Sequence, residues 1–396
     1  MSAAATTSTL IVGYARTPFV KFNGSLASVP ATALGAHAIT AALTRAGISP
    51  ADVDNVFAGQ VLQGGAGQNP ARQSAVGAGI PLSAPAMTLN VVCLSGIEAI
   101  VAGVRLIESG EADVVVAVGQ ESMSLAPHVW SGSRVGKKYG AIEFLDTVEH
   151  DGLTDAFEKR SMGASTEDYI APLKVSRGDQ DEVATASHTR LAASQAFLEG
   201  EIEPYILTTR SGSVSISTDD GVRPETTVES LGKLRPAFSA DGTITAGNAS
   251  QITDGAAAVI LMSESAAAAR GVTGIARVLA HAFVAGPDYS LHSQPANAIN
   301  AALAKTSVTT GDLVAVEINE AFAAVAVQST RVLGVDPAIV NAHGGAIAMG
   351  HPIGASGARI VGHLARRLAA AGSGATGAAG ICGGGGQGSA IVLQAL

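Results

Sequence analysis

Residues 38–43 (Ala-Ile-Thr-Ala-Ala-Leu) recur 260 positions later as residues 298–303 (Ala-Ile-Asn-Ala-Ala-Leu). In nearly the same register, the Ser-Gly pair at residues 95–96 aligns with the Ser-Gly pair at residues 356–357, and a helical pattern follows both pairs. Chance similarity between alanine-rich helices is the alternative explanation. Agreement at several separate places in one register favours an internal duplication, in which two similar halves pack together and their matching loops meet.

Apolar runs typical of buried strands alternate with amphipathic helical patterns throughout the repeated regions. The predicted strands cover residues 9–14, 53–61, 112–118 and 255–262, and the predicted helices cover residues 32–46, 70–79, 97–107 and 358–368. This alternation is typical of the α/β class and predicts a mostly parallel sheet with right-handed crossovers.

The middle of the chain differs in composition from both ends. Residues 124–250 are rich in charged side chains, mainly acidic, and contain one clear helical pattern over residues 177–198. We interpret this segment as an inserted loop domain that contributes to the substrate site. The chain is then divided into an N-terminal half (1–123, resuming at about 251–273), the insertion, and a C-terminal half (274–396).

Composition excludes several classes of protein. The formal charge of −9 argues against nucleic acid or an anionic membrane surface as the main partner. No apolar run approaches the roughly 18 residues of a membrane span. Two cysteines in 396 residues cannot form a disulfide framework, which favours a reducing compartment. The N-terminus shows no secretory signal pattern, and we expect a cytoplasmic protein.

One of the two cysteines, Cys93, stands in a loop that opens into a helical pattern. The positive end of a helix dipole lowers a thiol pKa below its free value of about 8.5, which predicts a reactive cysteine. An inert core cysteine is the plain alternative. The duplication predicts that its partners lie on loops of the second half, at residues 317–322, 341–357 and 382–388.

Those loops contain other candidate catalytic side chains. Asn319 alone is compatible with a helix cap, and His351 alone with a turn. The glycine run at 383–386 lies between two predicted strands, where glycine permits close backbone approach to a ligand. A metal site made by Cys93, Cys382 and His351 is a poor fit, because no pair has the short spacing typical of ligands.

Four separated motifs resemble those of the thiolase family and occur in the same order. They are Asn90-x-x-Cys93-x-Ser95-Gly96, Asn319-Glu320-Ala321-Phe322, Gly350-His351-Pro352 and Cys382-x-Gly384-Gly385-Gly386. The resemblance covers essentially the whole chain. It implies a duplicated thiolase-type fold, in which two βαβαβαββ halves pack in a layered α/β/α/β/α core with an inserted loop domain.

The resemblance also implies a role for each motif. Cys93 matches the nucleophile that accepts an acyl group from acyl-CoA, and His351 matches the group that accepts its proton. Cys382 matches the acid and base that acts on the α-carbon of the second acetyl-CoA. Asn319 and His351 match one oxyanion hole, and the backbone N–H groups of Cys93 and Gly384 match another.

Further positions match the coenzyme A site of the family. The matched residues are Ser250, Arg223, Met162, Ala246, Leu291, Ala321 and Phe322. The implied partners are acetyl-CoA, acetoacetyl-CoA and CoA, without a metal or redox cofactor. The resemblance further implies a homo-oligomer, either a dimer or a tetramer.

Two positions depart from the short-chain branch of the family. Ser161 stands where histidine is usual before a Met-Gly pair, and His343 stands where asparagine is frequent. The leading hypothesis is an acetyl-CoA C-acetyltransferase that condenses two acetyl-CoA reversibly through an acetyl-Cys93 intermediate. The alternatives are a 3-ketoacyl-CoA thiolase of β-oxidation with longer substrates and a non-catalytic acyl-CoA or lipid carrier.

Overall fold

The computed structural model describes residues 8–210 and 212–396. Its strands are β1 (Thr9–Arg16), β2 (Val20–Lys21), β3 (Asn55–Gly59), β4 (Ala86–Leu89), β5 (Val114–Glu121), β6 (His128–Val129), β7 (Leu145–Asp146), β8 (Tyr205–Thr209), β9 (Gly212–Ile216), β10 (Thr253–Ser263), β11 (Ala276–Ala285), β12 (Leu313–Ile318), β13 (Thr376–Gly383) and β14 (Gln387–Ala395).

Helices connect and cover these strands. They are α1 (Ala31–Ala46), α2 (Pro70–Gly77), α3 (Ser95–Glu108), α4 (Met162–Asp168), α5 (Ile170–Leu173), α6 (Arg177–Ala193), α7 (Gln195–Glu199), α8 (Val228–Gly232), α9 (Glu264–Arg270), α10 (Gln294–Leu303), α11 (Ala323–Leu333), α12 (Ala346–Met349) and α13 (Ser356–Ala371), with short turns η1 (Pro50–Asp52), η2 (Val148–Leu153) and η3 (Thr310–Asp312). None of the described helices is long and apolar enough to cross a membrane.

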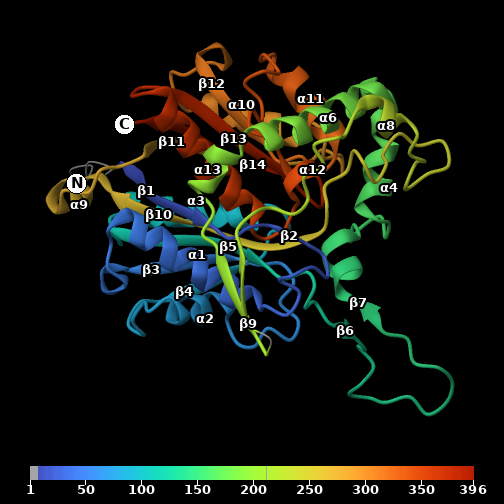
Figure 1. Ribbon diagram of the computed structural model, residues 1–396, viewed down its shortest axis with the longest axis horizontal. Coiled ribbons are helices and arrows are strands. Elements are labelled where there is room, and N and C mark those ends of the chain that lie inside the picture. Colours follow the sequence, from blue (N-terminus) through green and yellow to red (C-terminus); the bar gives the residue numbers. More distant parts are fainter. Residues whose placement is uncertain (1–7, 211) are drawn as a thin grey trace.

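Ten strands form one sheet in the order β12-β13-β14-β11-β1-β10-β5-β3-β4, with β2 paired to β10. Among the residues that the structure describes, β1 and β11 join the two halves of this sheet through two residue pairs, Leu10 with Arg277 and Ile11 with Ala276. In Figure 1 the N-terminal half (blue to cyan) therefore lies beside the C-terminal half (orange to red) as a distinct unit.

Three apolar clusters separate the layers. Alternate residues of β10 point to opposite faces, with Ile260 in an outer cluster beneath α1 and Leu261 in a central cluster around α3 and α13. In the C-terminal half, Ile391 of β14 faces the same central cluster, and Val392 faces an outer cluster beneath α10 and α11. The pair α3 and α13 is thus enclosed by both halves of the sheet.

This arrangement confirms the predicted duplication and the layered α/β/α/β/α core. The helices of the repeated stretch, α1 and α10, cover the outer faces of the two halves. The helices that follow the two Ser-Gly pairs, α3 and α13, pack against each other in the centre.

The prediction of a mostly parallel sheet was wrong. Within the described residues, parallel pairing in the large sheet is confined to β3–β4, β3–β5 and β12–β13, and its other strand pairs are antiparallel. A continuous apolar strand indicates burial on both faces, which the sequence correctly showed for β5. Burial on both faces does not fix strand direction, because helices also cover both faces of the antiparallel pair β5–β10.

The first turns of α3 and α13 meet at two glycines. A Cβ atom on Gly357 would lie 2.3 Å from the backbone nitrogen of Ile97, and one on Gly96 would lie 2.7 Å from the backbone nitrogen of Ala358. Both distances are too short for any side chain, so the helices approach this closely only because glycine has no Cβ. The loops that precede the two helices are thereby held together.

The described residues of the segment 124–250 add no strand to the large sheet. The fully buried guanidinium of Arg16 ties this segment to β1, through Glu201 at 2.7 Å and Asp219 at 2.7 Å. The loop between β6 and β7 projects away from the rest of the molecule (Figure 1). The domain boundaries placed at 123/124, 250/251 and 273/274 remain a prediction from composition.

We predict that Gly357→Ala destabilises the protein by roughly 2–3 kcal/mol, because the new methyl group overpacks a backbone-to-backbone contact. Urea unfolding followed by circular dichroism measures the change. Gly232→Ala is the matched control, since a Cβ there meets no atom within 4 Å, and it is expected to alter stability by less than about 0.5 kcal/mol. Equal stability of the two variants would show that the glycine contact does not constrain the core.

Candidate active site

Cys93 stands in a tight turn just before α3. The Asn90 side chain accepts a hydrogen bond from the Val92 backbone N–H at 3.0 Å, and the Ser95 hydroxyl donates to the Val92 carbonyl at 2.6 Å. Val92 has a φ of 51°, in the left-handed region that is costly for a β-branched residue. The turn holds this strained residue and so sets the direction of the neighbouring thiol.

The predicted lowering of the Cys93 pKa by the helix dipole was wrong. Burial raises the pKa of this thiol to about 12, and the nearby charge of Glu121 raises it further. Hydrogen bonds from the backbone N–H groups of Cys93 and Gly384 act in the opposite direction but are weaker. Desolvation raises the thiol pKa more than the nearby helix N-terminus lowers it, so Cys93 is a neutral thiol at rest.

Cys382 approaches Cys93 from the other half of the protein. It lies near the end of β13 and is buried, and the turn to β14 passes through Gly385 and Gly386, both with positive φ. Burial raises the pKa of the Cys382 thiol, and the charge of Cys93 raises it further. This effect of Cys93 on Cys382 places the two thiols near each other at the boundary between the halves.

His351 is buried on the loop that leads into α13. Its Nδ1 lies 2.6 Å from the Ser356 hydroxyl, and the Asn319 amide nitrogen lies 3.4 Å from Nδ1 and 3.5 Å from Nε2. Burial lowers the pKa of His351 to about 3, and the Arg359 charge adds to this effect. The imidazole is therefore neutral at physiological pH and has a free lone pair to accept a proton.

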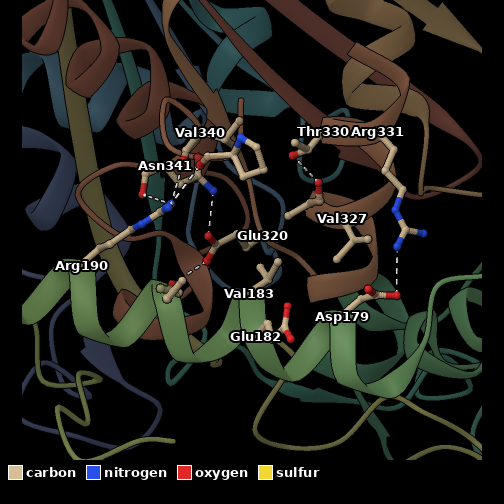
Figure 2. A pocket seen from close by; sticks show the side chains of 14 residues that line it. Asp179, Glu182, Val183, Arg190, Glu320, Val327, Thr330, Arg331, Val340 and Asn341 are labelled. Carbon is tan, nitrogen blue, oxygen red and sulfur yellow. Dashed lines mark hydrogen bonds and ion pairs between the residues drawn. The ribbon is translucent and has the colours of Figure 1, made fainter. Parts of the chain in front are cut away.

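The carboxylate of Glu320 fixes the position of the turn that contains Asn319. Its carboxylate is buried and accepts hydrogen bonds from the Ser187 hydroxyl at 2.7 Å, the Asn341 amide at 2.8 Å and the Ile347 backbone N–H at 3.2 Å. Figure 2 shows Glu320 and Asn341 at one side of a cavity of about 320 Å³ between α6 and α11. These bonds connect the turn to both the inserted segment and the His351 loop.

Glu121 does the same for the loop after β3 and the His351 loop. Its fully buried carboxylate, at the end of β5, accepts backbone N–H bonds from Val61 at 3.0 Å, Leu62 at 3.1 Å and Gly354 at 2.9 Å. Burial raises the pKa of Glu121 to about 7, against the opposing effect of the three N–H groups. One carboxyl group thus connects the end of β3 in one half with the His351 loop in the other.

A cavity of about 390 Å³ opens beside these groups. Of the predicted residues, Met162, Ser250, Phe322 and His351 line it. Cys93, which is half-buried, packs against an apolar cluster whose members Met123, Val148 and Ile353 also line the cavity, so the thiol lies next to the cavity.

The remaining predicted binding residues are not among those that line the cavity. The Ala321 carbonyl accepts a hydrogen bond from the Ser250 backbone N–H at 3.0 Å, and Leu291 belongs to the same apolar cluster as Phe322. Arg223 and Ala246 are exposed and are not among the cavity residues.

Comparison with known sequences agrees with this site. The thiolase N-terminal domain matches residues 9–265, and the thiolase C-terminal domain matches residues 272–395. The chain belongs to the thiolase family. It is therefore an acyltransferase enzyme and not the acyl-CoA carrier considered from the sequence.

Relatives of this thiolase cover nearly its full length. A protein of Mycolicibacterium smegmatis named "Probable acetyl-CoA acetyltransferase" is 52% identical over 97% of this chain and 100% of that protein. The acetyl-CoA acetyltransferase of Shinella zoogloeoides is 44% identical over 98% of this chain and 100% of that protein.

Two solved structures have the same fold. The acetyl-CoA acetyltransferase of Bacillus anthracis has a TM-score of 0.95 at 34% identity, and human mitochondrial 3-ketoacyl-CoA thiolase has a TM-score of 0.94 at 37% identity. Each comparison covers 99% of this chain and 100% of the other chain.

The two departures from the family pattern have structural roles in this thiolase. The Ser161 hydroxyl accepts the Ala164 backbone N–H at 3.3 Å and caps α4 beside the cavity. His343 lies away from the cavity, with its Nδ1 3.2 Å from the Nε2 of His363. Within the described residues, no group of three or more His, Cys, Asp and Glu side chains is arranged to hold a metal ion.

Sequence reasoning missed several residues of this site. Phe22, Met123, Val148 and Phe238 line the cavity, and no local pattern distinguished them from ordinary apolar positions. Glu121 had a usable signal, because it is a carboxylate at the end of an apolar strand. Ser356 also had one, since it belongs to the duplicated Ser-Gly pair.

We predict that His351 makes this thiolase less stable in acid. The unfolded chain protonates this imidazole below about pH 6.5, whereas the folded chain does not until about pH 3, so acid favours unfolding. Between about pH 7.5 and pH 5 the wild-type free energy of unfolding is expected to fall by about 2 kcal/mol more than that of His351→Gln. Urea unfolding at the two pH values measures it, and identical losses in both proteins would contradict the assigned pKa.

Proposed function

We propose that this thiolase is an acetyl-CoA C-acetyltransferase, which condenses two acetyl-CoA to acetoacetyl-CoA and free CoA and also catalyses the reverse thiolysis. The observation that carries the proposal is the near full-length similarity to proteins named acetyl-CoA acetyltransferase, at up to 52% identity. The gathering of Cys93, His351, Cys382 and Asn319 at the boundary between the two halves supports the same reaction.

In the first half-reaction, Cys93 takes the acetyl group. A thiol with a pKa of about 12 beside an imidazole with a pKa of about 3 rests as a neutral pair. The proton therefore moves to His351 as the sulfur attacks the thioester carbonyl, rather than in a separate earlier step. The Cys93 and Gly384 backbone N–H groups point to this region and serve as oxyanion donors.

In the second half-reaction, Cys382 removes a proton from the α-carbon of another acetyl-CoA. The enolate oxygen meets His351 and a water held by Asn319, and the carbanion attacks the acetyl group on Cys93. Cys382 is a buried neutral thiol at rest, so it first passes its own proton to Nε2 of His351; the resulting thiolate takes the α-proton, and the Nε2–H group donates to the enolate oxygen. When Cys93 leaves as a thiolate at the end of the condensation, His351 returns that proton to it. The reaction as proposed uses no metal or redox cofactor.

The binding site for the coenzyme A arm is the cavity of about 390 Å³. Met162, Phe238 and Phe322 give it an apolar lining suited to the pantetheine chain, and Ser250 supplies a hydroxyl. Arg223 and Ala246 are proposed to contact the distal part of CoA, outside the cavity. The acyl group points toward Cys93, next to the cavity residues Met123, Val148 and Ile353.

A 3-ketoacyl-CoA thiolase with longer substrates is the second candidate. It is favoured by the structural similarity to human mitochondrial 3-ketoacyl-CoA thiolase, at 37% identity. The higher identity, 44–52%, to relatives named acetyl-CoA acetyltransferase favours the short-chain assignment.

The chain-length preference separates the two candidates. The ratio kcat/KM for thiolysis is expected to be at least about 10-fold higher with acetoacetyl-CoA than with 3-ketohexadecanoyl-CoA, as the short-chain assignment requires. Met162→Ala enlarges the cavity and is expected to reduce this preference, whereas Val76→Ala, at an exposed position on α2, is expected to leave it unchanged. A preference for the long substrate in the wild type would overturn the proposal.

The two cysteine roles are separable by substitution. Cys93→Ser is expected to lower acetyl transfer by at least about 10³-fold, because a serine hydroxyl is a much poorer nucleophile beside a neutral imidazole. Cys382→Ser is expected to lower condensation to a similar degree while CoA release during acylation of Cys93 persists. Rapid-quench measurement of CoA release and acetoacetyl-CoA formation separates the steps, and simultaneous loss of both in Cys382→Ser would refute the assignment.

We further propose a homo-oligomer, a dimer or tetramer, in the cytoplasm. The strand β4 lies at the edge of the large sheet and exposes Met87, and nearby Leu82 is also exposed. The projecting loop between β6 and β7 exposes Val135 and Tyr139. Such apolar side chains are suited to contacts with another copy of the chain. Light scattering determines the number of subunits.

A further inference from the structure

Ser356, the first residue of α13, is fully buried beside His351. Its hydroxyl oxygen has two partners, the Pro352 carbonyl at 3.0 Å and the His351 Nδ1 at 2.6 Å. Ser356 therefore stands between the start of a rigid helix and the imidazole of the site.

The direction of these bonds assigns the protons. A serine hydroxyl has one proton to donate, and a carbonyl oxygen can only accept. In this geometry the Ser356 hydroxyl donates to the carbonyl four residues earlier, a common bond for serine in a helical turn. Its oxygen then presents a lone pair to Nδ1 of His351, and Nδ1 must supply the proton of the 2.6 Å bond.

A neutral imidazole has only one N–H group. With the proton on Nδ1, the lone pair of His351 is on Nε2. The Asn319 amide nitrogen lies 3.4 Å from Nδ1 and 3.5 Å from Nε2, so it does not distinguish between the two ring nitrogens. The Ser356 bond is therefore the contact that favours this tautomer.

We propose that Ser356 is a positioning residue, which holds the Nδ1–H tautomer and the ring orientation of His351 so that Nε2 faces Cys93 as the base. The inference rests on the proposed acetyl transfer. During acylation the Cys93 S–H bond breaks, Nε2 gains that proton, and a sulfur–carbon bond forms at the thioester carbonyl. The bond from that carbonyl to the CoA sulfur breaks, and the Nε2 proton passes to the departing CoA thiolate. The Nδ1 proton stays on the bond to Ser356 throughout.

The duplicated serine of the first half has a different task. The Ser95 hydroxyl accepts the Val91 backbone N–H at 2.9 Å and donates to the Val92 carbonyl at 2.6 Å, so both of its bonds hold the backbone of the Cys93 turn. In the second half, the matching serine, Ser356, makes one of its two bonds to the side chain of His351. The same structural position thus organises the nucleophile loop in one copy and the base in the other.

A double-mutant cycle tests the proposal on the full-length enzyme. Ser356→Ala is expected to slow single-turnover CoA release from acetyl-CoA by roughly 100-fold with KM unchanged, at the lower end of a general base's contribution. In a His351→Ala background the same change is expected to have no further effect, because Ser356 acts through the imidazole. An equal loss in both backgrounds would show a structural role and overturn the proposal.

The control is Ser329→Ala, which removes another fully buried hydroxyl that donates to a backbone carbonyl, that of His292. It is expected to match Ser356→Ala in melting temperature and the wild type in acylation rate. Ser356→Thr keeps the hydroxyl and is expected to restore acylation; a rate as low as that of Ser356→Ala would contradict the tautomer assignment.

The outcome also distinguishes this inference from the proposed function. A wild-type enzyme that releases no CoA from acetyl-CoA would refute the proposed function itself. A wild type that acylates Cys93, together with a Ser356→Ala variant of equal rate, would refute only the role of Ser356.

Discussion

The structure depends on the contact between the first turns of α3 and α13. Gly96 and Gly357 leave no room for a side chain where the two helices meet, at distances of 2.3–2.8 Å from an added Cβ to the nearest backbone atoms. Each helix belongs to a different half of the duplicated fold, and each follows a loop with a reactive side chain. The close approach of the helices therefore brings Cys93 and His351, more than 250 residues apart, into one site.

Buried polar groups then fix the loops around this contact. Glu121 accepts backbone N–H bonds from the end of β3 and from the His351 loop, and Glu320 accepts bonds from the inserted segment and from the segment that leads to His351. Their three-fold hydrogen bonding offsets the large cost of burying a carboxylate without a directly bonded cation. Both groups are thus better suited to hold loop geometry than to bind substrate.

Burial also determines the protonation of the site. The same low-dielectric surroundings raise the pKa of the Cys93 thiol and lower that of the His351 imidazole, which leaves both groups neutral. The sequence placed Cys93 before a helix and predicted an activated thiolate from the helix dipole alone. It gave no measure of desolvation, because the residues that surround the sulfur come from distant segments, among them Met123, Val148 and Ile353.

The sequence by itself determined the duplication, the alternation of strands and helices, and the four motifs that identify the family. These features are local patterns or repeats, so they are readable without contacts. Only the tertiary structure decided the antiparallel pairing around β10 and β14, the lining of the cavity, and the task of Ser356. Strand direction, cavity shape and proton position depend on which segments meet in space, and a one-dimensional pattern does not specify those distances.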